Sequence, residues 1–114
     1  MIGWVDATAG ASGDMLLGAL LGAGVPLAVL SDAVTAVSPE PVRLSVTQER
    51  RAGLAATRCH VEVADSSTHR SWSDVRALLE AAPLDAEVRE RSVRVFSRLA
   101  AAEAAARRLT VATV

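Results

Sequence analysis

The sequence predicts a small α+β fold, a two-layer domain with a mixed or antiparallel sheet and helices on one face. Residues 42–47 and 57–63 alternate between apolar and polar side chains, the period of half-buried strands. Apolar residues at helical spacing precede and follow these strands. The length of 114 residues indicates one domain, residues 1–114.

The first half of the chain predicts one strand and two helices. Residues 2–5 are apolar and end at Asp6, which favours a buried strand. A helix is expected from residue 13 or 14 to residue 23. Gly18 and Gly22 share one face of it, and this indicates that another segment approaches closely there. A second helix follows Gly24 and Pro26 and carries apolar residues at helical spacing: Leu27, Leu30, Val34 and Val37.

The second half predicts a hairpin and two further helices, which completes the order β-α-α-β-β-α-α. Residues 48–53 form the expected turn and residues 65–70 a loop. Ser71 and Asp74 are spaced as in a capping box, which starts the third helix. The last helix begins near Asp85 and runs through the Ala-rich residues 100–106. We expect the third helix to bury Trp72, Val75, Leu78 and Leu79, and the last to bury Val88, Val95, Phe96 and Leu99.

Composition excludes several classes of protein. The net charge of −1 gives no basic surplus, which argues against nucleic-acid or anionic-membrane partners. The uncharged stretch at residues 15–30 is shorter than the roughly 20 residues of a membrane span. Cys59 is the only cysteine and the N-terminus has no basic segment, so we expect a cytoplasmic protein without disulfides. Residues 110–114 are β-prone and uncapped, which predicts that the natural chain continues.

The residues from Asp6 to Asp14, here called the Asp6–Asp14 segment, are the strongest functional candidate. They join a predicted strand to a helix N-terminus, where unpaired N–H groups and the helix dipole favour an anion. Gly10 and Gly13 would let a phosphate approach the backbone, and Ser12 can cap the helix or donate to a phosphate oxygen. Asp6 and Asp14 could hold a metal ion. The spacing matches neither the phosphate-loop pattern nor the dinucleotide fingerprint.

Three stretches resemble one family along the whole chain. Residues 6–20 contain Ser-Gly-Asp-Met-Leu-Leu-Gly-Ala-Leu after a small-residue loop, and Gly24-Val25-Pro26 follows. Residues 69–75 read His-Arg-Ser-Trp-Ser-Asp-Val, and residues 95–104 include Val-Phe-Ser-Arg-Leu-Ala and Ala-Glu-Ala. In these motifs the chain resembles the N-terminal domain of the LarC family, the nickel insertion proteins of nickel-pincer nucleotide cofactor biosynthesis.

The resemblance implies a metallochelatase that inserts nickel, as substrate ion, into pyridinium-3,5-bisthiocarboxylic acid mononucleotide. The partners it implies are this precursor and a C-terminal domain that is missing here and carries CTP with a divalent metal. Family members are longer, and a His-x-His-Glu motif is expected after Val114, so we expect the fragment to be inactive alone. The implied roles are catalysis for Asp6 and Asp14, and ligand binding for Gly10, Ser12 and Gly13.

His69 and Arg70 match the His-Arg of the family. His69 is the candidate nickel ligand and Arg70 a candidate to bind a phosphate or carboxylate, although capping or surface roles also fit both. Family members often have more His before this Arg, and a His where this chain has Arg107. Cys59 and His60 are adjacent on a strand and therefore face opposite ways, so they should not share a metal site.

Two alternatives to a nickel chelatase remain open. The first helix is apolar on most sides, as in a non-catalytic module that binds another domain or forms a homo-oligomer. The glycines of the Asp6–Asp14 segment also suit a phosphate-binding domain of unrelated activity.

Overall fold

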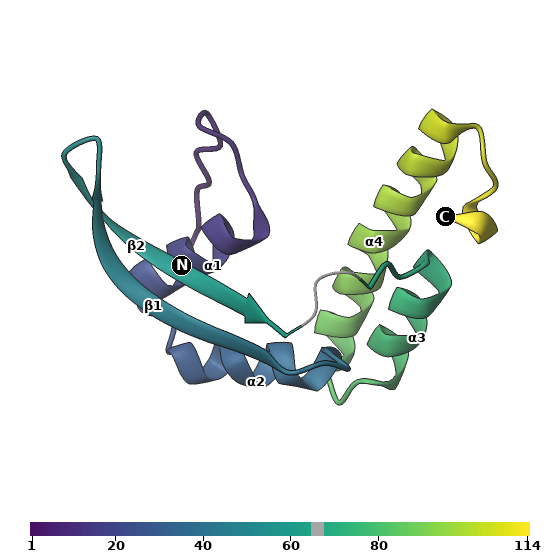
Figure 1. The fold of residues 1–114 in the computed structure, drawn as a ribbon, viewed down its shortest axis with the longest axis horizontal. Coiled ribbons are helices and arrows are strands. Elements are labelled where there is room, and N and C mark those ends of the chain that lie inside the picture. Colours follow the sequence, from purple (N-terminus) through teal and green to yellow (C-terminus); the bar gives the residue numbers. More distant parts are fainter. Residues whose placement is uncertain (65–67) are drawn as a thin grey trace. The chain divides into compact units, whose positions relative to one another are not determined.

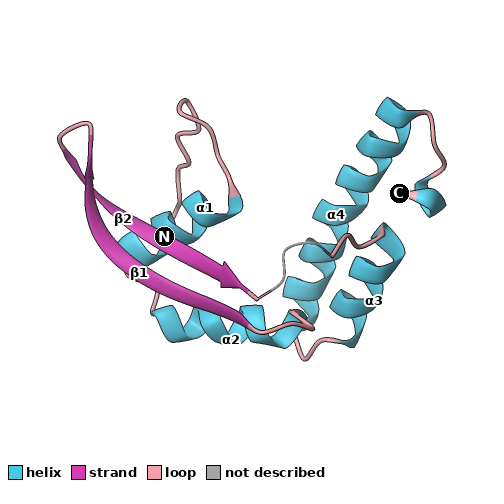
Figure 2. Ribbon diagram, in the orientation of Figure 1, coloured by secondary structure: helices cyan, strands magenta, loops and turns pink. Residues whose placement is uncertain are grey.

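The computed structural model describes residues 1–64 and 68–114 of the chain. Four α-helices, two strands and a short 3₁₀ turn follow one another in the order α-α-β-β-α-α-η (Figure 1; Figure 2). Their bounds are α1 (Gly13–Gly22), α2 (Leu27–Val37), β1 (Val42–Arg51), β2 (Leu54–Val63), α3 (Trp72–Ala81), α4 (Ala86–Arg107) and η1 (Val111–Thr113). The α+β class is therefore confirmed.

The described chain divides into two compact units, each with its own packing. Unit 1 comprises Met1–Asp32 and Val42–Glu62, and unit 2 comprises Ala33–Pro41 and Val63–Val114. Unit 1 contains α1, most of the β1–β2 hairpin and the start of α2, whereas unit 2 contains α3, α4 and η1. None of the described helices combines the length and hydropathy that a membrane crossing requires.

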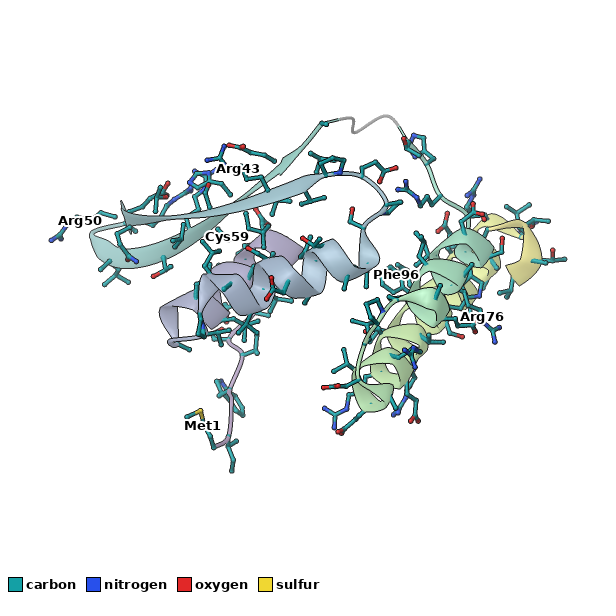
Figure 3. The ribbon with its side chains drawn as sticks, turned by 90° about the horizontal axis from the view of Figure 1, so that it is seen from below. Met1, Arg43, Arg50, Cys59, Arg76 and Phe96 are labelled. Carbon is teal, nitrogen blue, oxygen red and sulfur yellow. The ribbon has the colours of Figure 1, made fainter. Side chains whose placement is uncertain are left out.

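Unit 1 is built where α1 packs on the β1–β2 hairpin. Figure 3 shows Cys59 on the side of the hairpin that faces the helices, and this side chain is only 2% exposed. A Cβ added at Gly18 would lie 2.7 Å from the carbonyl oxygen of Thr57, and one at Gly22 would lie 3.3 Å from the Thr57 Oγ1. The predicted close approach at this glycine face is therefore confirmed, and its partner is β2.

The predicted strand at residues 2–5 is wrong. Within the described residues the sheet has two strands, β1 and β2, and residues 2–5 pair with neither. Ile2 is 97% exposed and Trp4 91% exposed, so these residues are not buried either. A short apolar run becomes a strand only if another strand is available for its backbone hydrogen bonds, and that condition cannot be read from the run itself.

The hairpin is longer than its alternation predicts. Its strands continue to Arg51 and resume at Leu54, so only Ala52 and Gly53 form the turn rather than residues 48–53. Both turn residues have positive φ, 49° for Ala52 and 80° for Gly53, which is the pattern of a type I′ turn. This tight turn lets the polar residues before it stay in the sheet.

The ends of α1 and α3 follow the expected capping chemistry. Gly24 (φ 102°) terminates α1, and the N–H of Val25 donates to the Leu20 carbonyl at 3.0 Å, as in a Schellman motif. At the start of α3, the Ser71 hydroxyl accepts from the Asp74 N–H at 3.2 Å, and the Asp74 carboxylate accepts from the Ser71 N–H at 3.1 Å. The predicted capping box is confirmed.

The packing of unit 2 differs from the expectation for the last helix. The buried residues here are Leu79, Ala82, Ala100 and Ala104. Of the residues expected on the inner face of α4, Val88, Val95, Phe96 and Leu99 are instead 40–66% exposed. Because α3 has 10 residues and α4 has 22, α3 covers only part of α4, and the small Ala residues let the two helices approach closely.

The C-terminal residues form a turn rather than the β structure their composition favours. Residues 111–113 are a 3₁₀ turn, which contacts α3 and α4. The N–H of Trp72 donates to the Val114 carbonyl at 2.7 Å. This hydrogen bond brings the end of the described chain to the first residue of α3.

Candidate functional site

The Asp6–Asp14 segment lies in unit 1 and begins with a turn closed by Asp6. The Asp6 Oδ1 accepts from the Thr8 N–H at 3.0 Å and also from the Thr8 hydroxyl. These two hydrogen bonds lower the pKa of Asp6, the hydroxyl contributing most. The N–H of Gly10 donates to the Ala7 carbonyl at 2.9 Å, and Gly10 has the positive φ (98°) that this turn needs.

Ser12 and Asp14 form the second half of the segment. Ser12 occupies the N-cap position of α1, where its carbonyl accepts the Leu16 N–H at 3.0 Å, but its side chain makes no capping bond. Its hydroxyl instead donates to Asp14 Oδ1, which also accepts from the Met15 N–H at 3.0 Å. The Ser12 hydroxyl is the main cause that lowers the pKa of Asp14, and the charge of Arg58 on β2 adds to it.

The segment is open to a ligand along its whole length. Residues 6–14 are all exposed, and a Cβ added at Gly10 or Gly13 would have no atom within 4 Å beyond the adjoining backbone and neighbouring residues. Both carboxylates are exposed and have lowered pKa values, so both are ionised at neutral pH and suited to a cation. Arg58, which the sequence did not suggest, brings positive charge from β2 close enough to act on Asp14.

His69 and Arg70 lie in unit 2, on a pocket of about 430 Å³, here called the α3–α4 pocket. Its walls combine aromatic and aliphatic side chains with charged side chains just before α3 and on α4. The lining residues are His69, Arg70, Trp72, Val75, Phe96, Leu99, Ala100, Glu103, Arg107 and Val114. Figure 3 shows Phe96 projecting from the ribbon of unit 2.

Each arginine of the α3–α4 pocket forms an ion pair with a glutamate. Arg70 Nη2 contacts Glu40 Oε1, and Arg107 Nη1 lies 2.8 Å from Glu103 Oε1 one helical turn away. His69 and Glu103 are the two side chains lining this pocket that could coordinate a metal ion. Among residues 1–64 and 68–114, no three His, Cys, Asp or Glu side chains gather as a metal site would require.

The remaining donors that the sequence suggested are separated in the structure. Cys59 is buried on the inner face of β2, while His60 Nε2 lies 2.8 Å from the Thr47 Oγ1 across the hairpin. Cys59 and His60 therefore lie on opposite faces of β2, as the strand alternation predicts. Residues 65–67 of the predicted loop lie outside the described residues.

The predicted site residues therefore form two groups. One group lies in the Asp6–Asp14 segment of unit 1 and comprises Asp6, Gly10, Ser12, Gly13 and Asp14. The other group, His69 and Arg70, belongs to unit 2. Sequence reasoning missed the other side chains of the α3–α4 pocket, among them Trp72, Phe96, Glu103 and Arg107. The resemblance at residues 69–75 and 95–104 was a usable indication, since both motifs line this pocket.

Fold and sites together define a small α+β chain that presents ionised carboxylates beside an open glycine backbone, and a separate aromatic pocket edged by charges. The model of the family described as nickel insertion protein matches residues 4–114. The chain belongs to the nickel insertion protein family.

Curated relatives agree with this membership. A protein from a Nocardioides species, named as a pyridinium-3,5-bisthiocarboxylic acid mononucleotide nickel insertion protein, is 69% identical over 89% of this chain and 26% of its own length. Relatives named for nickel insertion from Thermomicrobium roseum and Roseiflexus castenholzii are 46% and 42% identical, over 90% and 95% of this chain. The chain spans about a quarter of the length of these relatives, 26–27%. No solved structure matches it.

Proposed function

We propose that the chain is the N-terminal part of a cytoplasmic enzyme that inserts nickel into pyridinium-3,5-bisthiocarboxylic acid mononucleotide to form the nickel-pincer cofactor. The observation that carries this proposal is the 69% identity to the Nocardioides protein named for that insertion. Nickel is a substrate of the reaction. CTP, with its divalent metal, would bind in the C-terminal part that the longer relatives have and that this chain does not match.

The Asp6–Asp14 segment would take part in the metal step. Asp6 and Asp14 are exposed and ionised at neutral pH, so they can bind nickel and release it to the mononucleotide. Gly10 and Gly13 leave the backbone open to a phosphate, and Ser12 holds Asp14 in place or turns its hydroxyl to a phosphate oxygen. His69 would bind nickel in unit 2, next to Arg70.

The test is nickel insertion by the full-length protein, followed by mass spectrometry of the nickel-loaded mononucleotide. We expect Asp6→Ala and Asp14→Ala to lower the insertion rate by roughly a hundredfold or more, the range for loss of a group that acts on the reacting atoms. Asp32→Ala is the matched control, because Asp32 is an exposed acid of unit 1 outside the segment. Insertion at wild-type rate in both segment variants would overturn their assignment.

An interaction module is the second candidate function. It is favoured by large apolar side chains that lie exposed on described helices, such as Leu20 at 45% and Val95 at 66%. Such surfaces would pack against the C-terminal domain of the longer protein or a second copy. In that case the isolated chain would bind neither nickel nor the mononucleotide in calorimetry, and deletion of these residues would still disrupt the whole enzyme.

A further inference from the structure

The α3–α4 pocket has the size and the walls of a small-molecule site. Its volume of about 430 Å³ falls within the range of roughly 300–1,000 Å³ that such sites occupy. Trp72 and Phe96 contribute aromatic walls, while Val75 and Leu99 contribute aliphatic ones. Phe96 is 40% exposed and Leu99 59% exposed, so both can contact a ligand. A flat ring fits such walls.

Charged groups of both signs edge the same pocket. Arg70 and Arg107 supply guanidinium groups, and Glu103 supplies a carboxylate. Both arginines sit in partly exposed ion pairs, with side-chain exposures of 28% for Arg70 and 59% for Arg107. Exposed pairs of this kind are weak, so an incoming anion can replace or join the glutamate. A guanidinium has five N–H donors, and each of these ion pairs engages one of its nitrogens.

We propose that the α3–α4 pocket binds the pyridinium ring of the mononucleotide together with one of its anionic thiocarboxylate groups. This inference rests on the proposed function for its ligand. The positive ring pairs with the aromatic faces of Trp72 and Phe96 and with the Glu103 carboxylate. The thiocarboxylate pairs with Arg107 and Arg70, whose planar donors suit a carboxylate-like group. A second pocket among the described residues, lined by Glu87, Glu90, Arg91, Arg94 and Val95, has charges of both signs but no aromatic wall.

The test measures mononucleotide binding to the full-length protein by titration calorimetry, without nickel or CTP. We expect Arg107→Ala to raise the dissociation constant for the mononucleotide about tenfold or more, as loss of a charge-assisted hydrogen bond does. Arg91→Ala is the matched control, since Arg91 also forms an i,i+4 ion pair on α4 but does not line the pocket. We expect Phe96→Ala to weaken binding several-fold, and Val95→Ala, its exposed neighbour, to leave binding unchanged.

Two simpler probes separate the ring from the phosphate. We expect N-methylpyridinium-3,5-dicarboxylate to bind and to lose affinity in Arg107→Ala, whereas the affinity for inorganic phosphate should be the same in both proteins. If Arg107→Ala lowered the affinity for inorganic phosphate but not for the dicarboxylate probe, the assignment of this pocket to the pyridinium ring would be overturned. The wild type could bind the mononucleotide and insert nickel while Arg107→Ala and Phe96→Ala bind the mononucleotide as tightly as the wild type. That result would overturn the pocket assignment and leave the proposed function supported. If the wild type binds no mononucleotide, both fall.

Discussion

Gly18 lies where α1 approaches the backbone of β2 in unit 1. A Cβ at this position would be 2.7 Å from the Thr57 carbonyl oxygen, which belongs to a strand and cannot move aside easily. Gly18→Ala should therefore lower the free energy of unfolding by about 1–3 kcal/mol, despite the higher helix propensity of Ala. Chemical denaturation followed by circular dichroism measures this change.

Gly22→Ala is the control for this prediction. Its Cβ would meet the side chain of Thr57 at 3.3 Å, and a side chain can adjust by a few tenths of an ångström. The gain in helix propensity, up to about 1 kcal/mol, should then offset the contact and leave stability close to that of the wild type. Equal destabilisation by both substitutions would contradict the packing at Gly18.

Ala52 has a left-handed backbone conformation, which Asn and Gly adopt more readily than Ala does. Its φ of 49° lies in the left-handed region, at the first central position of the type I′ turn. Ala52→Asn would produce Asn-Gly, the favoured sequence of such turns, and should raise the free energy of unfolding by about 0.5–1 kcal/mol. Ala55→Asn, in β2 and also at an exposed position, should not stabilise the chain, and melting temperatures compare the two variants.

At the scale of elements, α3 starts with a pH-dependent cap. Hydrogen bonds from the Ser71 hydroxyl and then from the Ser71 N–H lower the pKa of Asp74. A lowered folded-state pKa means that the cap stabilises the chain above the unfolded value of about 3.9 and that this contribution is lost as pH falls further. Asp74→Asn should therefore be less stable than the wild type at pH 7, and the difference should shrink below about pH 4.

Urea unfolding at pH 7 and at pH 3 measures this difference. Asp85→Asn provides the control, because Asp85 holds the N-cap position of α4 without a side-chain capping bond. A stability difference for Asp74→Asn that is the same at both pH values would rule out an ionised Asp74 as the cause.

The end of α3 depends on an arginine from α4. Arg89 donates from Nη2 to the carbonyls of Ala82 at 2.9 Å and Leu84 at 3.1 Å, and from Nε to Leu79 at 3.3 Å. These carbonyls lie at and beyond the C-terminus of α3, where no helical N–H can reach them. We expect Arg89→Ala to reduce the free energy of unfolding by about 1–3 kcal/mol.

Arg89→Lys should recover only part of this loss, since an ammonium group lacks the planar fork of the guanidinium. Arg91→Ala, two residues along α4 and 72% exposed, should stay within about 0.5 kcal/mol of the wild type. Equal stability of Arg89→Ala and Arg91→Ala in denaturant titrations would show that the contacts to α3 do not hold the helix end.

At the scale of the whole molecule, the sequence patterns predicted the features that depend on residues close to one another along the chain. The hairpin, the four helices, the capping box at Ser71 and the close approach at Gly18 all follow from local spacing. The residues 2–5 and the inner face of α4 were predicted wrongly, because each depends on which other element lies beside it. The α3–α4 pocket could not be predicted either, since it joins residues 69–75, 96–107 and 114.

Exposed apolar side chains are spread along α4 and predict self-association of the isolated chain. Val88 is 49% exposed and Val95 66% exposed, and they lie two turns apart on one side of the helix. We expect the chain to associate at high concentration, and Val88→Glu with Val95→Glu to reduce this in sedimentation measurements. Arg94→Glu, at an exposed polar position of the same helix, is the control. A wild-type monomer at every concentration would exclude this surface as a self-association site.

Cys59 gives the chain an internal reporter of motion in unit 1. It is the only thiol in the sequence and is 2% exposed between the hairpin and α1. An alkylating reagent can reach it only when this packing opens, so the labelling rate under native conditions measures how often unit 1 opens. Unit 2 contains no cysteine, so unfolding of unit 2 alone exposes no thiol to the alkylating reagent. The opening equilibrium of one half of the chain can thus be followed without introducing a probe.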